Sequence, residues 1–156
     1  MGVGRIEAIL IGSTATEEPL SVAAAAAVAG RGLAGDRYHD GVGTWTGWRG
    51  ITAGQALTLV EAEALEAAGE ELGLEVTGAM ARRNVVTRGI SLEALVGHRF
   101  RIGEVECAGD RPCDPCRHLE QLTAPGLLRA LTGRGGLRAD LLGSGTVHVG
   151  DAIGPA

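Results

Sequence analysis

Glycine is the residue type that most limits the folds open to this chain. The sequence of 156 residues contains 26 glycines, scattered without a repeat, and only five prolines. Scattered glycine at more than twice its usual share of about 7% is typical of tight turns and close backbone approaches. Apolar residues (45%) and charged residues (21%) lie near the globular average, which excludes disordered and collagen-like chains. We therefore expect one compact, β-rich domain over residues 1–156.

The hydrophobic pattern predicts many short strands and few helices. Residues 99–107 alternate polar and apolar side chains and predict a half-buried strand, in which Cys107 belongs to the core. Residues 61–71 are rich in Glu and Ala and predict the best helix, ended by Gly73. Residues 21–28 stay ambiguous, because their alanines favour helix while a glycine turn follows at once. Further strands are predicted at 5–11, 55–60, 84–87, 137–142 and 146–153, and short helices at 91–95, with Ser91 as its N-cap, and 126–131. The fold class is α+β and mostly β: a strongly bent, mostly antiparallel sheet that closes into a barrel.

Charge is distributed unevenly along the chain. The net charge is −5 at pH 7, which disfavours general binding to nucleic acid. All 14 basic residues are arginine, and ten of them fall within residues 82–138. Arginine grips phosphate and other oxyanions in a bidentate manner, so this stretch is suited to a small anion. A salt-bridged, solvated surface explains the same pattern equally well. The lack of lysine excludes Schiff-base chemistry within this chain, and hence pyridoxal phosphate as a cofactor.

The compartment follows from what the sequence lacks. No stretch reaches the roughly 20 apolar residues that a membrane helix needs. The first residues show no charged segment followed by an apolar one, and three closely spaced cysteines do not resemble a secreted disulfide framework. We expect a cytoplasmic protein with reduced thiols, bound neither to membrane nor to nucleic acid.

The densest group of reactive side chains lies between Cys107 and Glu120. It follows a predicted strand and contains Pro112 and Pro115, so we expect a stiff loop at a strand end. Arg111, Arg117 and His118 would favour the thiolate form of Cys113 or Cys116, the form that binds metals and attacks electrophiles. Three interpretations stay open: a zinc site using Cys113, Cys116 and His118, a redox dithiol, and a single reactive or metal-binding cysteine. Alternatively, Cys113 and Cys116 are two unreactive thiols in a loop and have no functional role.

Two further segments can place polar groups at a defined point. Arg82, Arg83 and Asn84 precede a predicted strand that ends in Thr87 and Arg88, and together they can present several donors to one anion. Exposed arginines on a surface strand are the ordinary alternative. Two glycines precede Asp36 and Arg37, which indicates a tight turn that fixes these two charges. A salt-bridged turn explains that segment as well.

These segments, in their order, resemble the MOSC domain family, named after the C-terminal part of molybdenum cofactor sulfurase and found in stand-alone bacterial proteins. The resemblance rests on Gly-Asp-Arg-Tyr, Arg-Arg-Asn-Val-Val-Thr-Arg-Gly-Ile, Leu-Val-Gly-x-x-Phe-x-Ile-Gly-Glu-Val, Pro-Cys-x-x-Leu-Glu, Arg-Gly-Gly-Leu-Arg-Ala and a closing Val-Gly-Asp. It spans residues 5–153 and implies a bent β-barrel that binds the molybdenum cofactor, a molybdopterin with a phosphate tail. In enzymatic members a cysteine thiolate binds the molybdenum.

The resemblance assigns candidate roles to individual residues. Pro115-Cys116 matches the Pro-Cys pair of the stand-alone branch, so Cys116 is the expected molybdenum ligand and catalytic residue; Cys113, which also follows a proline, is the alternative. Arg83 and Asn84 match the segment expected near the cofactor phosphate. The other candidate cofactor-binding residues are Asp36, Arg37, Arg88, Arg111, Cys113 and His118.

The expected function is binding of the molybdenum cofactor or its sulfurated precursor. If the protein is an enzyme, it is a molybdenum-dependent reductase of N-hydroxylated compounds that takes electrons from a separate partner protein. The first alternative is a sulfur-carrier or cofactor-delivery module, in which Cys113 or Cys116 carries a persulfide received from a sulfur-donor protein. The second alternative is a zinc-binding protein that uses the C-x-x-C-x-H cluster.

Overall fold

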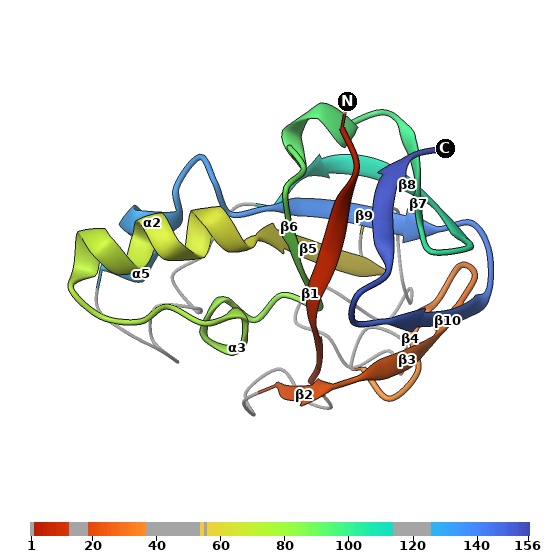
Figure 1. The fold of residues 1–156 in the computed structure, drawn as a ribbon, viewed down its shortest axis with the longest axis horizontal. Helices are drawn as coiled ribbons and strands as arrows, with labels where there is room; N and C mark the ends of the chain where they lie inside the picture. Colours follow the sequence, from red (N-terminus) through yellow and green to blue (C-terminus); the bar gives the residue numbers. More distant parts are fainter. Residues whose placement is uncertain (1, 13–18, 37–53, 55, 114–125) are drawn as a thin grey trace, which may run out of the picture.

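The structure is a computed structural model that describes residues 2–12, 19–36, 54, 56–113 and 126–156. Strands dominate the described part of the chain, and its helices are short. Figure 1 labels most of these elements along the chain. The strands are β1 (Gly4–Ile11), β2 (Leu20–Val22), β3 (Ala24–Val28), β4 (Gly32–Leu33), β5 (Leu57–Glu61), β6 (Val85–Arg88), β7 (Arg99–Ile102), β8 (Val105–Pro112), β9 (Leu137–Leu141), β10 (Gly145–His148) and β11 (Ala152–Pro155); the helices are α2 (Ala62–Leu72), α3 (Gly78–Ala81), the 3-10 turn η1 (Glu93–Leu95) and α5 (Leu127–Leu131).

The main sheet closes into a barrel. Its order is β11-β7-β8-β9-β5-β6-β1-β2, and β11 also pairs with β1, so seven strands form a closed ring to which β2 is added. Gly4 lies opposite Ile153 at this closure, which explains why the two ends of the chain lie close together in Figure 1. Closure leaves these seven strands without a free edge within the ring. The prediction of a bent, mostly antiparallel sheet closing into a barrel is confirmed.

One pair in the ring is parallel. Strands β5 and β6 run in the same direction, so the chain must cross back between them, and α2 and α3 lie in that connection. The helices pack on the outside of the barrel, where α2, α3 and α5 gather on one side (Figure 1). This crossover places Glu61, the last residue of β5, directly before the first turn of α2.

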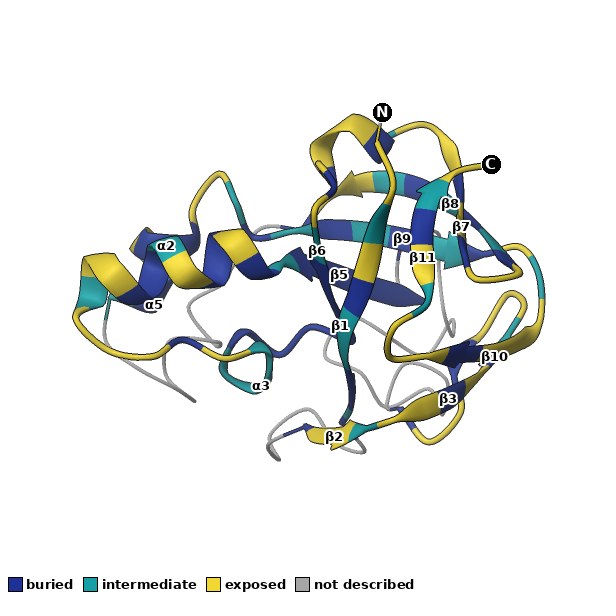
Figure 2. Cartoon of the chain, in the orientation of Figure 1, coloured by how far each residue is buried: buried dark blue, intermediate teal, exposed yellow. Residues whose placement is uncertain are grey.

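Two apolar clusters hold the fold together. The barrel interior is filled by inward-facing side chains of the ring strands, with Phe100 fully buried among them. The second cluster lies between the outer face of the barrel and the helices, and it includes Val60, Leu65, Leu127 and Leu131. Figure 2 shows α2 with exposed residues on one face and buried residues on the other, as expected for a helix that covers a sheet.

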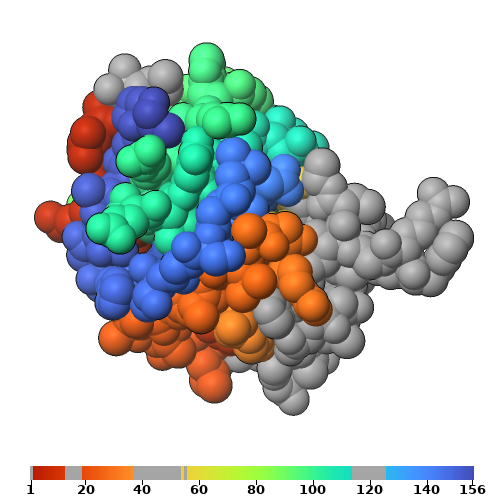
Figure 3. All heavy atoms as spheres, turned by 90° about the vertical axis from the view of Figure 1, so that its right-hand side faces the viewer, coloured from red at the N-terminus to blue at the C-terminus, as the bar shows by residue number. Residues whose placement is uncertain are grey.

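The ambiguous alanine run forms strands. Residues 20–22 and 24–28 form β2 and β3, and β3 pairs with both β10 and β4 in a separate three-stranded sheet. Ala25 and Ala27 are buried while their neighbours Ala24 and Ala26 are exposed, which is the period of a strand. Pairing with β10, more than 115 residues later in the chain, overrides the helical preference of alanine. In Figure 3 the N-terminal segment in orange lies beside the C-terminal segment in blue.

Two long predicted strands are each divided into two strands by a glycine turn. Residues 99–107 were expected to form one strand, but Gly103 has a φ of +57° and turns the chain between β7 and β8. Residues 146–153 divide into β10 and β11 at Gly150, whose φ is +96°. Strands β7 and β8 pair with each other as a hairpin, whereas β10 pairs with β3 and β11 pairs with β1 and β7, in a different sheet. Both predictions of a single strand were wrong, because alternation of polar and apolar residues continues across each glycine turn and does not reveal it.

The helix predictions at 61–71 and 126–131 are confirmed as α2 and α5. Gly73 ends α2 in the left-handed conformation, with a φ of 68°, as predicted. The turn at 91–95 is η1, but it begins after Leu92 and no side chain caps it, so the N-cap assigned to Ser91 was wrong. The short helix α3, whose first turn is capped by Thr77, was not predicted. Within the described residues, none of these helices is long and apolar enough to cross a membrane.

Candidate functional site

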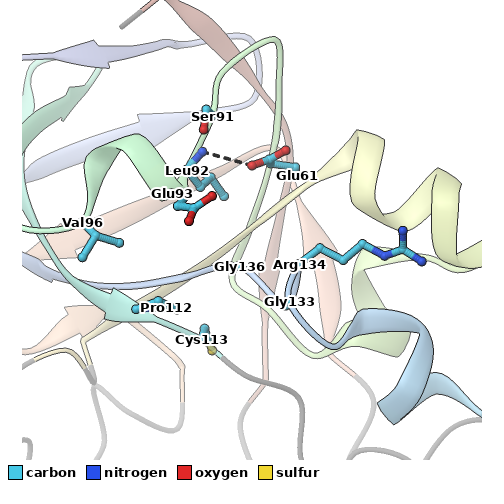
Figure 4. Close-up of a pocket in the computed structure, with 11 residues that line it drawn as sticks. Glu61, Ser91, Leu92, Glu93, Val96, Pro112, Cys113, Gly133, Arg134 and Gly136 are labelled. Atoms are coloured by element: carbon cyan, nitrogen blue, oxygen red, sulfur yellow. Dashed lines mark hydrogen bonds between the residues drawn. The ribbon is translucent and has the colours of Figure 1, made fainter.

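A pocket of about 510 Å³ opens where β8 ends beside η1 (Figure 4). Strand β5, the turn around η1, the end of β8 and the glycine-rich segment before β9 all contribute to its wall. The Glu61 carboxylate accepts a hydrogen bond from the backbone N–H of Leu92 at 3.0 Å and so joins two of these segments. The lining residues are Glu61, Ser91, Leu92, Glu93, Val96, Pro112, Cys113, Gly133, Arg134, Gly135 and Gly136.

Cys113 lies at the point where the segments of this pocket converge. Its backbone N–H donates to the carbonyl of Gly136 at 2.8 Å, and its residue surface is fully buried. Residues 107–112 belong to β8, so the prediction that the strand ends at Cys107 and a loop follows it directly was wrong: pairing with β9 extends the strand to Pro112. The cysteine segment therefore begins directly at the strand end.

Arg83 ties this strand end to two other segments. Its guanidinium donates to the carbonyl oxygens of Gly135 (2.9 Å), Ala81 (3.3 Å) and Cys113 (3.3 Å). The residue is only 8% exposed. The structure thus brings together Arg83 and Cys113, which the sequence places in separate motifs 30 residues apart. In this arrangement Arg83 is a positioning residue that fixes where Cys113 lies.

Asn84 has a different set of partners. Its Oδ1 accepts from the backbone N–H of Thr58 at 3.1 Å and from the Thr58 hydroxyl at 3.2 Å, and its Nδ2 donates to the carbonyl of Leu10 at 3.3 Å. These bonds join the start of β6 to β5 and to the end of β1. Because buried amide groups must be paired, Asn84 is a cross-link of the barrel wall.

Arg88 lies at the other end of β6 and faces the start of α2. Its guanidinium bonds to Glu7 at 2.8 Å and to Glu66 at 2.7 Å. These hydrogen bonds, that to Glu7 first, raise the pKa of Arg88 above its ordinary value. The carboxylate of Glu63 accepts from the Gly89 N–H nearby. None of these contacts joins Arg88 to Arg83 or Cys113, so the described residues do not gather the arginines of this segment around one anion.

The remaining candidates are distributed as follows. Asp36 is fully buried and accepts from the backbone N–H of Gly12 at 3.0 Å, just after β1. Arg111 forms an ion pair with its neighbour Asp110 on β8. Arg37, Cys116 and His118 lie outside the described residues, and their predicted roles stay predictions. Within the described ranges, no three His, Cys, Asp or Glu side chains are grouped to hold a metal ion.

Sequence reasoning gave no role to Arg138, although it lies in the Arg-Gly-Gly-Leu-Arg-Ala motif. One guanidinium nitrogen of Arg138, Nη1, is buried and has no hydrogen-bond partner in the described part of the structure. Arg138 lies on β9, directly opposite Thr58 on one side and Arg111 on the other. No signal in the sequence singles it out, because the Leu-Arg-Ala-Asp-Leu pattern of residues 137–141 puts Arg138 and Asp140 at the polar positions of an ordinary half-buried strand.

Cys107 is a core residue, as its place on a predicted strand indicated. Its surface is fully buried within the barrel cluster, and burial, with a smaller contribution from the charge of Glu106, raises the pKa of its thiol to about 12. A thiol with this pKa is almost wholly protonated at neutral pH, and a protonated thiol is a poor nucleophile and a poor metal ligand. Cys107 is therefore excluded from the candidate site.

We predict that Cys107 resists thiol reagents in the folded protein at pH 8 and reacts only after unfolding. Mass spectrometry after alkylation in native buffer and in denaturant measures this. Since folding raises this pKa, the thiol's contribution to stability is fully present below about pH 9 and is lost as the pH rises towards 12. Alkylation of Cys107 in native buffer as fast as in denaturant would contradict the assignment.

Comparison with known proteins identifies the family. The sequence profile of the MOSC domain matches residues 36–154, most of the chain, and the protein belongs to the MOSC domain family. Comparison with curated protein sequences finds no match.

Solved structures share the fold. The YuaD protein of Bacillus subtilis superimposes with a TM-score of 0.81 at 20% identity, over 97% of this chain and 94% of that one. YiiM from Geobacillus stearothermophilus gives 0.73 at 19% identity, over 99% of this chain and 75% of that one. YiiM from Escherichia coli gives 0.69 at 19% identity, over 97% and 69%. At 19–20% sequence identity, these similarities show a shared fold and nothing more.

Proposed function

We propose that this protein binds the molybdenum cofactor at the end of β8, with a cysteine thiolate between residues 113 and 116 as the molybdenum ligand. The observation that carries the proposal is the hydrogen bond from Arg83 to the carbonyl of Cys113, which unites the two motifs that the family resemblance assigns to the cofactor. Membership of the MOSC family supports the choice of ligand.

The chemistry of the donor set fits such a group. A cysteine thiolate is the soft ligand that molybdenum shares with other thiophilic metals. The positive charge of Arg83 beside Cys113 favours an anion at this strand end, and Arg138 offers a buried nitrogen that has no hydrogen-bond partner among the described residues. Cys116 is the first candidate for the ligand because it follows Pro115 directly, and Cys113 is the alternative.

The contacts of the described residues around this strand end suggest a role for each of them. Arg83 fixes the strand end that precedes the thiolate, and the Gly136 carbonyl holds Cys113 by its N–H. The pocket beside η1 offers room for a small substrate, with the carboxylates of Glu61 and Glu93 in its wall. When bound, the cofactor supplies a metal that changes oxidation state. We propose the reduction of N-hydroxylated compounds, with electrons from a separate protein in the cytoplasm.

The two alternatives depend on residues outside the described ranges. Full burial of Cys113 argues against that residue as a sulfur carrier, because a persulfide sulfur must be reached by its donor and acceptor. A carrier therefore relies on Cys116, and a zinc site needs both Cys116 and His118. Metal and pterin analysis, together with mass spectrometry for a bound sulfur, separates the three functions.

The test is metal and pterin analysis of protein purified from a host that makes the molybdenum cofactor. We expect stoichiometric molybdenum and oxidised-pterin fluorescence in the unaltered protein. Cys116→Ser should lose molybdenum, whereas Cys113→Ser should retain it, and Cys107→Ala is the matched control for removing a thiol away from the site. Circular dichroism of each variant verifies folding.

The other outcomes reassign the site. Full molybdenum in Cys116→Ser with none in Cys113→Ser moves the ligand to Cys113. Zinc without pterin replaces the proposal with a zinc-binding protein. Neither metal nor pterin, together with a mass increase of one sulfur after incubation with a cysteine desulfurase, replaces it with a sulfur carrier.

A further inference from the structure

Two carboxylates line the pocket beside η1. Glu61 is the last residue of β5 and Glu93 the first residue of η1, and the side chains of both contribute to the pocket wall. The Glu61 carboxylate uses one oxygen, Oε2, to accept the hydrogen bond from the Leu92 N–H at 3.0 Å. Within the described part of the chain, its Oε1 and both oxygens of Glu93 receive no hydrogen bond. These three oxygens can therefore accept hydrogen bonds from a ligand in the pocket.

The basic side chains near the pocket are engaged elsewhere. Arg134 is the basic residue among the described residues that line it, and its guanidinium donates to the Glu71 carboxylate at 2.6 Å and to the Ala130 carbonyl at 2.7 Å. Figure 4 shows this guanidinium directed away from the two pocket carboxylates. Arg83 is bound to backbone carbonyls beside Cys113, at the other end of the pocket. Among the described residues, neither pocket carboxylate has an ion-pair partner.

A buried hydroxyl beside Glu61 also lacks a partner. Thr87 lies directly opposite Glu61 in the parallel pair of β5 and β6. Leu59 and Val85, two positions earlier on these strands, belong to the barrel core, so Glu61 and Thr87 face the same interior. Thr87 is fully buried, and its Oγ1 has no hydrogen-bond partner in the part of the chain that the structure describes. Because buried polar groups are normally paired, this hydroxyl independently indicates a polar ligand at this end of the barrel.

The shape of the pocket indicates the size and the orientation of that ligand. Its volume of about 510 Å³ is typical of a small-molecule site. Leu92, Val96 and Pro112 give its wall an apolar part, which suits the body of an organic molecule. Figure 4 shows the two carboxylates on one side of the pocket and Cys113 on the other. A ligand bound through the carboxylates would therefore extend towards the cysteine.

We propose that this pocket selects small organic cations, and that Glu61 and Glu93 hold the protonated amine of the ligand. Hydrogen bonds from an ammonium group to a carboxylate are about twice as strong as those between neutral groups, whereas an anionic ligand would be repelled. The inference rests on the proposed function in that the ligand is the substrate. It narrows the substrate class to N-hydroxylated compounds that carry a separate protonated amine.

The first experiment is calorimetric titration of the purified protein with three probes of similar size at constant ionic strength. The probes are benzylammonium, benzyl alcohol and benzoate, which are cationic, neutral and anionic at pH 7. We expect benzylammonium to bind about tenfold or more tightly than benzyl alcohol, the factor expected for a hydrogen bond to a charged group. Benzoate should bind most weakly. Added salt should weaken binding of benzylammonium and leave that of benzyl alcohol nearly unchanged, because salt screens charge.

Variants assign this preference to the two carboxylates. Glu61→Gln and Glu93→Gln remove the charge but keep the side-chain length, and the amide oxygen of Glu61→Gln can still accept from Leu92. Each should reduce the preference for benzylammonium by about threefold, and the double variant should abolish it. The control is Glu104→Gln, which removes an exposed carboxylate from the turn between β7 and β8, outside the pocket lining, and should keep the preference. If Glu61→Gln does not fold, loss of preference in Glu93→Gln decides alone.

Three results would overturn the inference: no binding of any probe, equal binding of benzylammonium and benzyl alcohol by the unaltered protein, or an unchanged preference in the folded variants. Metal and pterin analysis of the same preparation judges the proposed function separately. Bound molybdenum without a preference for the cation contradicts the acidic specificity of the pocket alone. A preference that the variants remove, in protein without molybdenum or pterin, supports the cation site and contradicts the proposed function.

Discussion

Replacing Gly136 with alanine is expected to destabilise the fold severely. Gly136 has a φ of +112°, and a Cβ built on it would overlap the carbonyl oxygen of Leu59 on the neighbouring strand β5. The atom in the way belongs to the backbone and cannot rotate aside, so β9 would have to move away from β5. These two paired strands form part of the barrel wall. Strain at such a φ costs about 1–3 kcal/mol and overpacking a further 1–3 kcal/mol. We therefore expect a loss of about 4 kcal/mol, a large part of a typical domain's stability of about 5–15 kcal/mol.

The matched control for this substitution lies in the same segment. Gly133 also has a positive φ, +80°, but a Cβ there would meet no atom within 4 Å. Gly133→Ala should therefore cost only about 1–2 kcal/mol, the conformational part alone. Chemical denaturation of both variants measures the difference. Equal stabilities for the two variants would contradict the close approach of β9 to β5.

Gly136 also holds the cysteine segment. Its carbonyl accepts the hydrogen bond from the Cys113 N–H, so displacement of Gly136 moves the strand end to which the proposed thiolate belongs. Any folded fraction of Gly136→Ala should thus lose bound molybdenum. Gly133→Ala should retain it.

Replacing Arg83 with methionine should remove both stability and cofactor binding. The substitution leaves the carbonyl oxygens of Gly135, Ala81 and Cys113 without the donor that now joins them, within a site only 8% exposed. A buried group left without its partner costs about 1–3 kcal/mol. With three carbonyls affected and partial access of water, we expect a loss of about 3 kcal/mol. The measurement is chemical denaturation, followed by metal analysis of the folded protein.

Arg134 provides the control for Arg83. It also donates to a backbone carbonyl, that of Ala130, and it pairs with Glu71, but its side chain is 38% exposed. Arg134→Met should therefore cost no more than about 1 kcal/mol, the ordinary range for an exposed ion pair. Arg83→Lys keeps the charge but cannot reach three carbonyls from one ammonium group, so we expect it to resemble Arg83→Met. A stability of Arg83→Met equal to that of Arg134→Met would refute the positioning role.

The elements that the sequence predicted well are those governed by near neighbours. Helix α2 follows from its Glu and Ala content and ends at Gly73, where a left-handed conformation is required. Strand β1 follows from alternation between residues 5 and 11. The family is also readable from the sequence alone, because its motifs keep their order along the chain and the matched region extends over residues 36–154.

The sequence predicted residues of the candidate site, but only as members of separate motifs. The sequence pointed to Arg83 and to Cys113, but the hydrogen bond between them exists because β8 ends beside the segment that precedes β9. Arg88 was placed with Arg83 because the two residues lie at opposite ends of one predicted strand. Its partners Glu7 and Glu66 come from β1 and α2, which meet only in the folded barrel.

Local sequence determined helix α2 with its glycine end and the alternating apolar faces of the strands, since these depend on residues within about four positions of one another. Pairing between distant strands decided the rest. The alanines of β3 form a strand because β10 lies beside them, and the charge of Arg138 lies opposite that of Arg111 because β8 and β9 pair in one register. A single sequence carries no direct record of such contacts, because pairing across a long loop depends on the whole barrel closing at once.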